Sequence, residues 1–203
     1  MLTGDLIRLR FVQRFGTCAV QFKESVAEHS YYTAMYAMLL CEWLQENYKD
    51  GDIHRWGCSN TAEVLCRALI HDVEEARTGD CPRPFKHGSA SLLAAMQQGA
   101  AKAADHVLSG LGEGCEDLRE LWLVAKDPSL EGRVLEFADY LSVLGYCALE
   151  LGSRNDTMLE HIDDIQGYAR LFHDKEYDFM RALVEDADEL RVFIFKGVDC
   201  EKN

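Results

Sequence analysis

The chain has 203 residues, of which 48% are hydrophobic and 28% are charged, and its formal net charge is −14. This length and apolar content allow one sizeable core, and the excess of acid argues against general nucleic-acid binding. No apolar run approaches the ~18–20 residues of a membrane span, so neither nucleic acid nor membrane is an expected partner. Residues 91–203 hold 11 lysines and arginines against 23 acids, whereas residues 1–90 hold 10 against 12. An anionic substrate would therefore find its cations more readily in the first half.

Eight cysteines are scattered along the chain without a CxxC pair, so the spacing of a zinc finger is absent. The first five residues, MLTGD, carry an early acid and no apolar core, so no cleavable signal is expected. We therefore expect reduced thiols and a cytoplasmic location.

Three prolines and long amphipathic runs predict an all-α protein. In chain order, helices are expected over residues 5–14, 27–47, 61–77, 89–110, 115–126, 130–151, 156–173 and 175–195. Ser25 is expected to cap the second helix, with Glu28 three residues later in a capping-box pattern, and Asn60 or Thr61 caps the third. The sequence TGDCPRP at 78–84 predicts a loop, because glycine and two prolines interrupt a helix.

An adjacent histidine and aspartate, His71 and Asp72, lie in the third expected helix, and Glu75 follows one turn after His71. Residues four apart on a helix share a face, whereas Asp72 is about 100° round from His71. An imidazole beside a carboxylate suits a borderline or hard divalent cation. Such a pair is common by chance, so a solvent-facing histidine remains an alternative.

Two residues on other expected helices are candidates for the same ion. His29 lies in the first turn of its helix, where the positive end of the helix dipole lowers the imidazole pKa and favours metal binding over protonation. Asp139 lies among apolar residues, and a carboxylate in such surroundings is rarely buried unless it is paired or metal-bound. The alternatives are a water-facing histidine and a carboxylate on a solvated stripe.

Other charged residues close in sequence to these candidates suggest how an anion is bound and attacked. Arg14, Arg83 and Lys86 stand in loops or at helix ends, and arginine suits bidentate phosphate binding. Each is equally compatible with a solvated surface cation. Glu75, if it is not a ligand, could orient or deprotonate a water at the metal.

The arrangement of His29, the pair His71-Asp72, and Asp139 resembles that of the HD-domain metal-dependent phosphohydrolases. Within them, the sequence is most similar to the bacterial 5′-deoxynucleotidases. The resemblance covers roughly residues 6–150 and is carried by RLRFVQRF at 8–15, SVAEHS at 25–30, HDVEEARTGDCPRPFK at 71–86 and FADYL at 137–141. The third of these segments is the most specific.

The resemblance implies one helical HD domain over residues 1–203, with the metal site between helices and C-terminal helices within 156–195. It implies one divalent ion (Co, Mn, Zn, Fe, Ni or Mg), held by His29, His71, Asp72 and Asp139. Arg14 would hold the phosphate, Glu75 would handle protons and Asp80 would meet the sugar. The other residues expected at the substrate are Phe15, Cys81, Pro82, Arg83 and Lys86.

The implied function is metal-dependent hydrolysis of a deoxynucleoside 5′-monophosphate to deoxynucleoside and phosphate. Helical HD proteins commonly self-associate, so a homo-oligomer is expected. Phe15 stands where the family has tryptophan, so an indole N–H that bears on deoxyribose selection is missing.

Two alternatives remain. Arg83 stands where the family has threonine, and this added cation favours a longer phosphate chain, as in the phage enzymes that remove triphosphate from deoxyadenosine triphosphate. A non-catalytic HD protein that binds a nucleotide as a sensor is the alternative of another class. Retention of Glu75 and Asp80 argues against the sensor, because a sensor needs no proton-transfer group.

Overall fold

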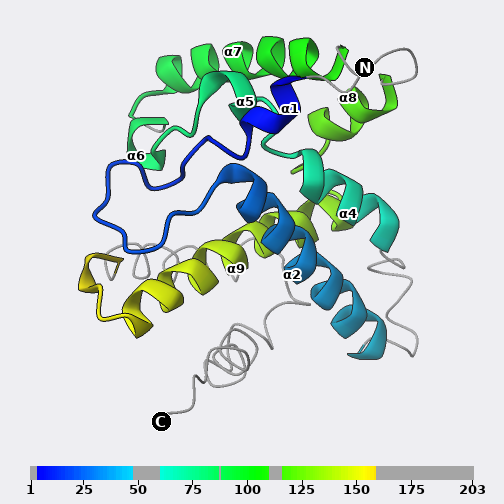
Figure 1. Cartoon of the computed structure of the whole chain (residues 1–203). Coiled ribbons are helices and arrows are strands. Elements are labelled where there is room, and N and C mark those ends of the chain that lie inside the picture. Colours follow the sequence, from blue (N-terminus) through cyan, green and yellow to red (C-terminus); the bar gives the residue numbers. More distant parts are fainter. Residues whose placement is uncertain (1–3, 48–59, 87, 110–115, 159–203) are drawn as a thin grey trace. The chain divides into compact units, whose positions relative to one another are not determined.

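A computed structural model of the chain describes residues 4–47, 60–86, 88–109 and 116–158 (Figure 1). Within these ranges the regular structure is helical, apart from one isolated β-bridge between Gln13 and Ser25, so the all-α prediction is confirmed. The helices are α1 (Gly4–Arg8), α2 (Val26–Asn47), α4 (Thr61–Ile70), α5 (Glu75–Thr78), α6 (Arg83–Lys86), α7 (Ala90–Ser109), α8 (Glu116–Leu123) and α9 (Leu130–Gly152), followed by a 3₁₀ turn (Asp156–Met158). The remainder of the two helices expected within 156–195 lies outside the described residues.

The chain divides into two compact units, which are described separately. The first comprises Met1–Cys18 with Lys23–Asp139, and the second comprises Ala19–Phe22 with Tyr140–Asn203. The single domain expected over 1–203 stays a prediction. None of the described helices combines the length and the apolar character that a membrane crossing requires.

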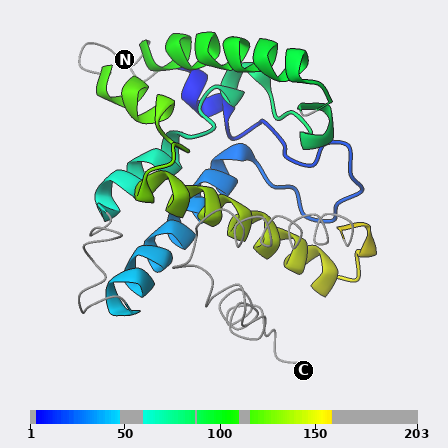
Figure 2. The same cartoon turned by 180° about the vertical axis from the view of Figure 1, so that it is seen from behind.

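In the first unit, α2 packs against α4, and α7 runs beside α5 (Figures 1 and 2). A cluster of buried apolar side chains joins α2, α5, α7 and the turn after α4 to the turn after α1. Its members are Leu9, Val26, Val73, Ala76, Ala104, Val107 and Leu108.

The start of α2 is fixed by the predicted capping box. The backbone N–H of Glu28 donates to Ser25 Oγ (3.2 Å), and the backbone N–H of Ser25 donates to the Glu28 carboxylate (2.7 Å). Two backbone N–H groups at the start of the helix, those of Ser25 and Glu28, therefore each have a side-chain acceptor. This cap places His29 in the first turn, where its side chain is fully buried. The alternative of a water-facing histidine is therefore wrong.

The first expected helix, 5–14, ends early, at Arg8. The chain instead turns and runs alongside the segment that leads into α2. Val26 donates its backbone N–H to the carbonyl of Val12 (3.0 Å), and Arg14 donates to the carbonyl of Glu24 (2.9 Å). Pairing between these two segments replaces the helical hydrogen bonds and brings Arg14 next to the start of α2.

The third expected helix is also interrupted. Asn60 caps α4, since its side-chain oxygen accepts from the backbone of Glu63 (3.2 Å), but α4 ends at Ile70 rather than near Arg77. Residues 71–74 form tighter turns, and a separate short helix, α5, follows. The pair His71-Asp72 therefore lies at the end of a helix and not within one. A further difference is that the expected loop 78–84 runs into α6 at Arg83.

Arg67 of α4 hydrogen-bonds to the turn between α8 and α9. The Arg67 residue is 5% exposed. Its guanidinium donates to the carbonyl of Val124 (2.7 Å), to Asp127 Oδ1 (3.0 Å) and to Ser129 Oγ (3.2 Å). Its other side binds the Glu63 carboxylate (2.5 Å). A buried guanidinium with this many partners fixes the position of the turn.

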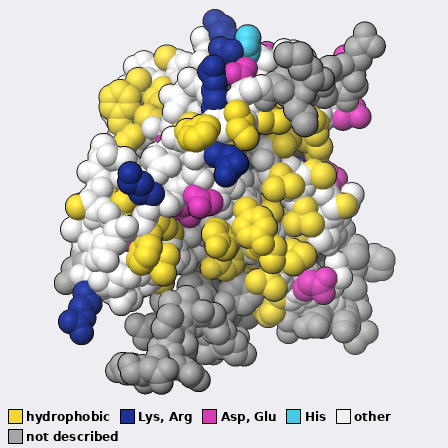
Figure 3. All heavy atoms as spheres, viewed as in Figure 1, with side chains coloured by type: hydrophobic (Ala, Val, Ile, Leu, Met, Phe, Trp, Pro, Cys, Tyr) yellow, Lys and Arg dark blue, Asp and Glu magenta, His cyan; other side chains and the backbone are white. Residues whose placement is uncertain are grey.

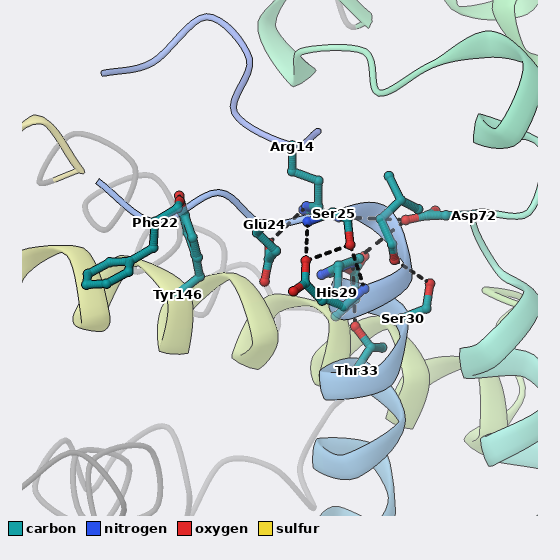
Figure 4. Close-up of polar contacts among 12 residues, drawn as sticks. Arg14, Phe22, Glu24, Ser25, His29, Ser30, Thr33, Asp72 and Tyr146 are labelled. Carbon is teal, nitrogen blue, oxygen red and sulfur yellow. Dashed lines mark hydrogen bonds and ion pairs between the residues drawn. The ribbon is translucent and has the colours of Figure 1, made fainter. Parts of the chain in front are cut away.

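In the second unit, the fully buried carboxylate of Glu150 ties residues 19–22 to the end of α9. It accepts hydrogen bonds from the backbone of Gln21 (3.0 Å) and Phe22 (2.7 Å), from Asn155 (2.5 Å) and from Tyr146 (3.2 Å). Burial opposes ionisation, but these donors hold the pKa of Glu150 below its ordinary value. The Tyr146 hydroxyl also donates to the carbonyl of Phe22 (2.6 Å), as Figure 4 shows.

Apolar side chains gather on the face seen in Figure 3. The exposed large apolar residues of the first unit include Tyr31, Met35 and Leu39, which follow one another at four-residue spacing along α2. Self-association of the chain stays a prediction.

The packing of the α8–α9 turn against the start of α9 gives a test of the fold. A Cβ built on Gly132 would lie 2.2 Å from the carbonyl oxygen of Asp127. We expect Gly132→Ala to lower the free energy of unfolding by about 1–3 kcal/mol, because overpacking outweighs the gain of about 1 kcal/mol in helix propensity. Urea denaturation measures this change.

Gly99→Ala in α7 is the matched control, because nothing lies within 4 Å of its Cβ position. This variant should be as stable as the wild type or more stable, by up to about 1 kcal/mol. If Gly132→Ala behaved in the same way as Gly99→Ala, the described packing of the turn would be wrong.

Candidate metal and phosphate site

All four predicted metal ligands come together in the first unit. His29 comes from the first turn of α2, His71 and Asp72 from the turn after α4, and Asp139 from the middle of α9. Nε2 of His29 lies 2.9 Å from Asp139 Oδ1 and 3.7 Å from Asp72 Oδ2, and His71 Nε2 lies 3.0 Å from the same Asp72 oxygen. One donor atom each from His29, His71 and Asp139 lies within 4.8 Å of the others. These residues form a candidate metal site.

The imidazole of His71 is oriented for binding a cation. Its Nδ1 lies 2.7 Å from the carbonyl oxygen of Ala68, so Nδ1 donates and Nε2 faces Asp72 and the other candidate ligands. Nε2 is buried, and its contact is the Asp72 carboxylate oxygen at 3.0 Å. Burial opposes protonation, but Asp72 raises the pKa of His71 above its ordinary value. A divalent cation would therefore displace a proton when it takes Nε2.

His29 is in the neutral form that binds metals. Burial, followed by the charge of Arg14, lowers the pKa of His29 to about 4. Its ring centroid lies 5.4 Å from that of His71, at an interplanar angle of 61°. The two imidazoles thus converge from different elements without stacking.

The two carboxylates are ionised although both are largely buried. Burial opposes ionisation, but Lys126 and His29 hold the pKa of Asp139 well below its ordinary value, and His71 does the same for Asp72. Two imidazoles and two carboxylates form a donor set that suits a divalent transition metal better than calcium. The residues present therefore fit a metal ion.

Arg14 lies against this donor set, as expected for a phosphate-binding residue. Its Nη1 is 3.7 Å from Asp72 Oδ2, and its Nε is 3.4 Å from Glu24 Oε2 (Figure 4). Burial works against the charge, but Asp139, Asp72, Glu24 and Asp80 together raise the pKa of Arg14 above its ordinary value. The guanidinium stays charged next to the site.

Phe15 and Asp80 lie beside Arg14. The backbone N–H of Phe15 donates to the Asp80 carboxylate, and Phe15 has a φ of 54°, which is uncommon for a residue other than glycine. The guanidinium carbon of Arg14 lies 5.6 Å from the centroid of the Phe15 ring. Gly79 takes a φ of 72° as α5 ends, and so directs Asp80 away from the helix. Three predicted substrate residues are therefore neighbours.

Glu75 is the predicted proton-handling residue, and it also lies near the candidate ligands. Burial, then the charges of Asp72 and Asp80, raise the pKa of Glu75 to about 10. Its Oε2 is buried without a hydrogen-bond partner among the described residues. Without a cation, the side chain is a neutral acid at pH 7.

The remaining predicted substrate residues lie towards the surface. Cys81 is half-buried, and Pro82 and Lys86 are exposed. Lys86 lies close enough to lower the pKa of Asp80, although burial raises that pKa overall. The side chain of Arg83 lies outside the described residues.

No local sequence pattern pointed to Glu24 and Lys126, which contact the site, or to Trp122, which contacts Glu74 beside Glu75. Glu24 is 6% exposed and pairs with Arg14, and burial raises its pKa to about 7. Lys126 Nζ lies 2.5 Å from Asp139 Oδ2, and the Trp122 indole N–H donates to the Glu74 carboxylate (2.8 Å). Because each partner is at least ten residues away, no local pattern identifies these contacts.

Known proteins are similar to this chain in sequence and in fold. The family model of the YfbR-like 5′-deoxynucleotidases matches residues 2–167. The chain is 30% identical to the 5′-deoxynucleotidase VV1113 of Vibrio vulnificus over 153 residues, which are 75% of each protein.

Solved structures with this fold include an HD-domain phosphohydrolase (lin2634) from Listeria innocua, with a TM-score of 0.73, 20% identity, and coverage of 93% of this chain and 87% of that one. The cyanophage S-2L HD phosphohydrolase DatZ, solved with dA and one catalytic Zn²⁺ ion, has a TM-score of 0.55, 18% identity, and coverage of 84% and 85%. The chain therefore belongs to the YfbR-like 5′-deoxynucleotidase family.

Proposed function

We propose that this protein hydrolyses deoxynucleoside 5′-monophosphates to deoxynucleoside and phosphate, with one divalent ion held by His29, His71, Asp72 and Asp139. The observation that carries the proposal is that these largely buried donors lie together and next to Arg14, whose Nη1 is 3.7 Å from Asp72. Membership of a 5′-deoxynucleotidase family and the name of the Vibrio relative support the substrate class.

The ion, one of Co, Mn, Zn, Fe, Ni or Mg, would polarise the phosphoryl group and lower the pKa of the attacking water. Arg14 binds a phosphate oxygen and offsets the negative charge that develops on it. Glu24 holds the guanidinium from the opposite side, since its carboxylate lies 3.4 Å from Arg14 Nε. The Phe15 ring and Asp80 border the deoxyribose.

Glu75 moves the proton. A divalent cation nearby would lower the pKa of Glu75 from the value of about 10 that burial and neighbouring carboxylates give it. Glu75 then accepts a proton from water as the new P–O bond forms. The same proton passes to the 5′-oxygen as its bond to phosphorus breaks, so the products are an alcohol and phosphate.

The charges around the site favour a monophosphate. Both cations at the site already face carboxylates, Arg14 those of Asp72 and Glu24, and Lys126 that of Asp139. A monophosphate, with about two negative charges, then balances a divalent ion. The triphosphohydrolase alternative rests on Arg83, whose side chain lies outside the described residues, and on Lys86, which is exposed. The cytoplasmic location stays a prediction.

A substrate panel tests the function. We expect metal-stripped protein supplied with a single divalent ion to release inorganic phosphate from deoxynucleoside monophosphates and to leave triphosphates largely intact. Chromatography of the products, with metal-stripped protein as the control, measures this. Release of triphosphate from deoxynucleoside triphosphates would instead establish the triphosphohydrolase. No release from any nucleotide would favour the non-catalytic sensor.

Glu75→Gln separates proton transfer from metal binding. The variant keeps the size of the side chain but cannot take a proton, so we expect metal content to be unchanged and kcat to fall by about 10²–10⁴-fold. Elemental analysis and phosphate release measure the two quantities. His71→Ala is the matched control and should lose both metal and turnover. Loss of metal from Glu75→Gln would instead indicate that Glu75 is a ligand.

A further inference from the structure

We infer that Lys126 is a positioning residue for the metal site: its ammonium group binds one oxygen of Asp139 and so presents the other oxygen to the imidazoles. The inference rests on the metal site of the proposed function, and it concerns a residue outside the set of ligands, phosphate contacts and proton-handling groups given above.

The two oxygens of Asp139 have different partners. Lys126 Nζ lies 2.5 Å from Oδ2, whereas Oδ1 lies 2.9 Å from His29 Nε2. A carboxylate held at both oxygens has its rotation fixed. Oδ1 is thereby placed among the donor atoms, while Oδ2 is turned towards the lysine.

The backbone on both sides of Lys126 is held in place. Two residues before it, the carbonyl of Val124 accepts from Arg67 (2.7 Å), and three residues after it, Ser129 Oγ accepts from the same guanidinium (3.2 Å). Ala125, next to Lys126, is 4% exposed. The lysine therefore extends from a fixed turn, which lowers the entropy lost when its ammonium binds Asp139.

The pairing also separates two negative charges. Oxygens of Asp72 and Asp139 both lie near His29 Nε2, at 3.7 and 2.9 Å, so the two carboxylates repel each other. Arg14 binds Asp72, and Lys126 binds Asp139. The two carboxylates can thus remain close together before a metal ion arrives.

Lys126 has two opposite effects on an incoming cation. Its positive charge repels the ion, whereas the orientation of Asp139 favours binding. The lysine side chain is 37% exposed, so water screens its charge, but the Asp139 side chain is only 19% exposed and depends on its partners for orientation. The orienting effect therefore dominates, as is usual for groups that hydrogen-bond a metal-ligating carboxylate.

Metal affinity tests the inference without recourse to turnover. Competition with a fluorescent chelator would measure the Kd of Mn²⁺ for metal-stripped wild type, Lys126→Met and Lys126→Arg. We expect Lys126→Met to raise this Kd by at least ~10-fold, and Lys126→Arg to restore most of the affinity, because arginine keeps a charged donor. Lys102→Met, at an exposed lysine of α7, is the matched control and should bind as the wild type does.

Thermal unfolding of the metal-stripped proteins separates positioning from folding. Lys126→Met should melt somewhat below the wild type, because Asp139 loses its cation, but it should still unfold in one cooperative transition. If it does not, Lys126→Gln, which keeps a neutral donor, replaces it in the affinity measurement. An unchanged or tighter Kd in the folded variant would overturn the inference. His71→Ala shows which idea has failed: if it loses Mn²⁺ while Lys126→Met keeps it, only the role of Lys126 is wrong, whereas retention by both refutes the metal site itself.

Discussion

The close approach of two largely buried carboxylates, Asp72 and Asp139, is the constraint on which the rest of the site depends. Oxygens of both lie within 3.7 Å of one imidazole nitrogen, that of His29, so each charge needs compensation where water is scarce. His71 and Arg14 lie beside Asp72, at 3.0 and 3.7 Å, and Lys126 binds Asp139. A divalent ion would add its own positive charge to this balance and hold the same oxygens more strongly.

The local structures around the site position the side chains that surround these two carboxylates. The capping box of Ser25 and Glu28 buries His29 at the start of α2, and the end of α4 at Ile70 lets His71 and Asp72 face the same point. Further from the site, Arg67 holds the turn that carries Lys126. The interactions are therefore layered: a second set of hydrogen bonds and ion pairs fixes the groups that would contact metal and phosphate.

The sequence predicted the helical class from its amphipathic runs and few prolines. It predicted the meeting of the four proposed ligands through the family resemblance, which the segment HDVEEARTGDCPRPFK at 71–86 carries most specifically. It did not predict that α4 stops at Ile70, since strong helix formers continue to Arg77 and only the tertiary arrangement ends the helix. Glu24 and Lys126 were missed for a related reason. Their partners lie 10 and 13 residues away, and each resembles an ordinary surface charge in its own segment.

The most direct measurement is anomalous X-ray diffraction from crystals grown with Mn²⁺ or Zn²⁺, recorded on both sides of the metal absorption edge. The account predicts one strong anomalous peak, with His29 Nε2, His71 Nε2, Asp139 Oδ1 and an oxygen of Asp72 at coordination distance and Lys126 on the other oxygen of Asp139. A peak elsewhere, or an ion bound without the two histidines, would contradict it.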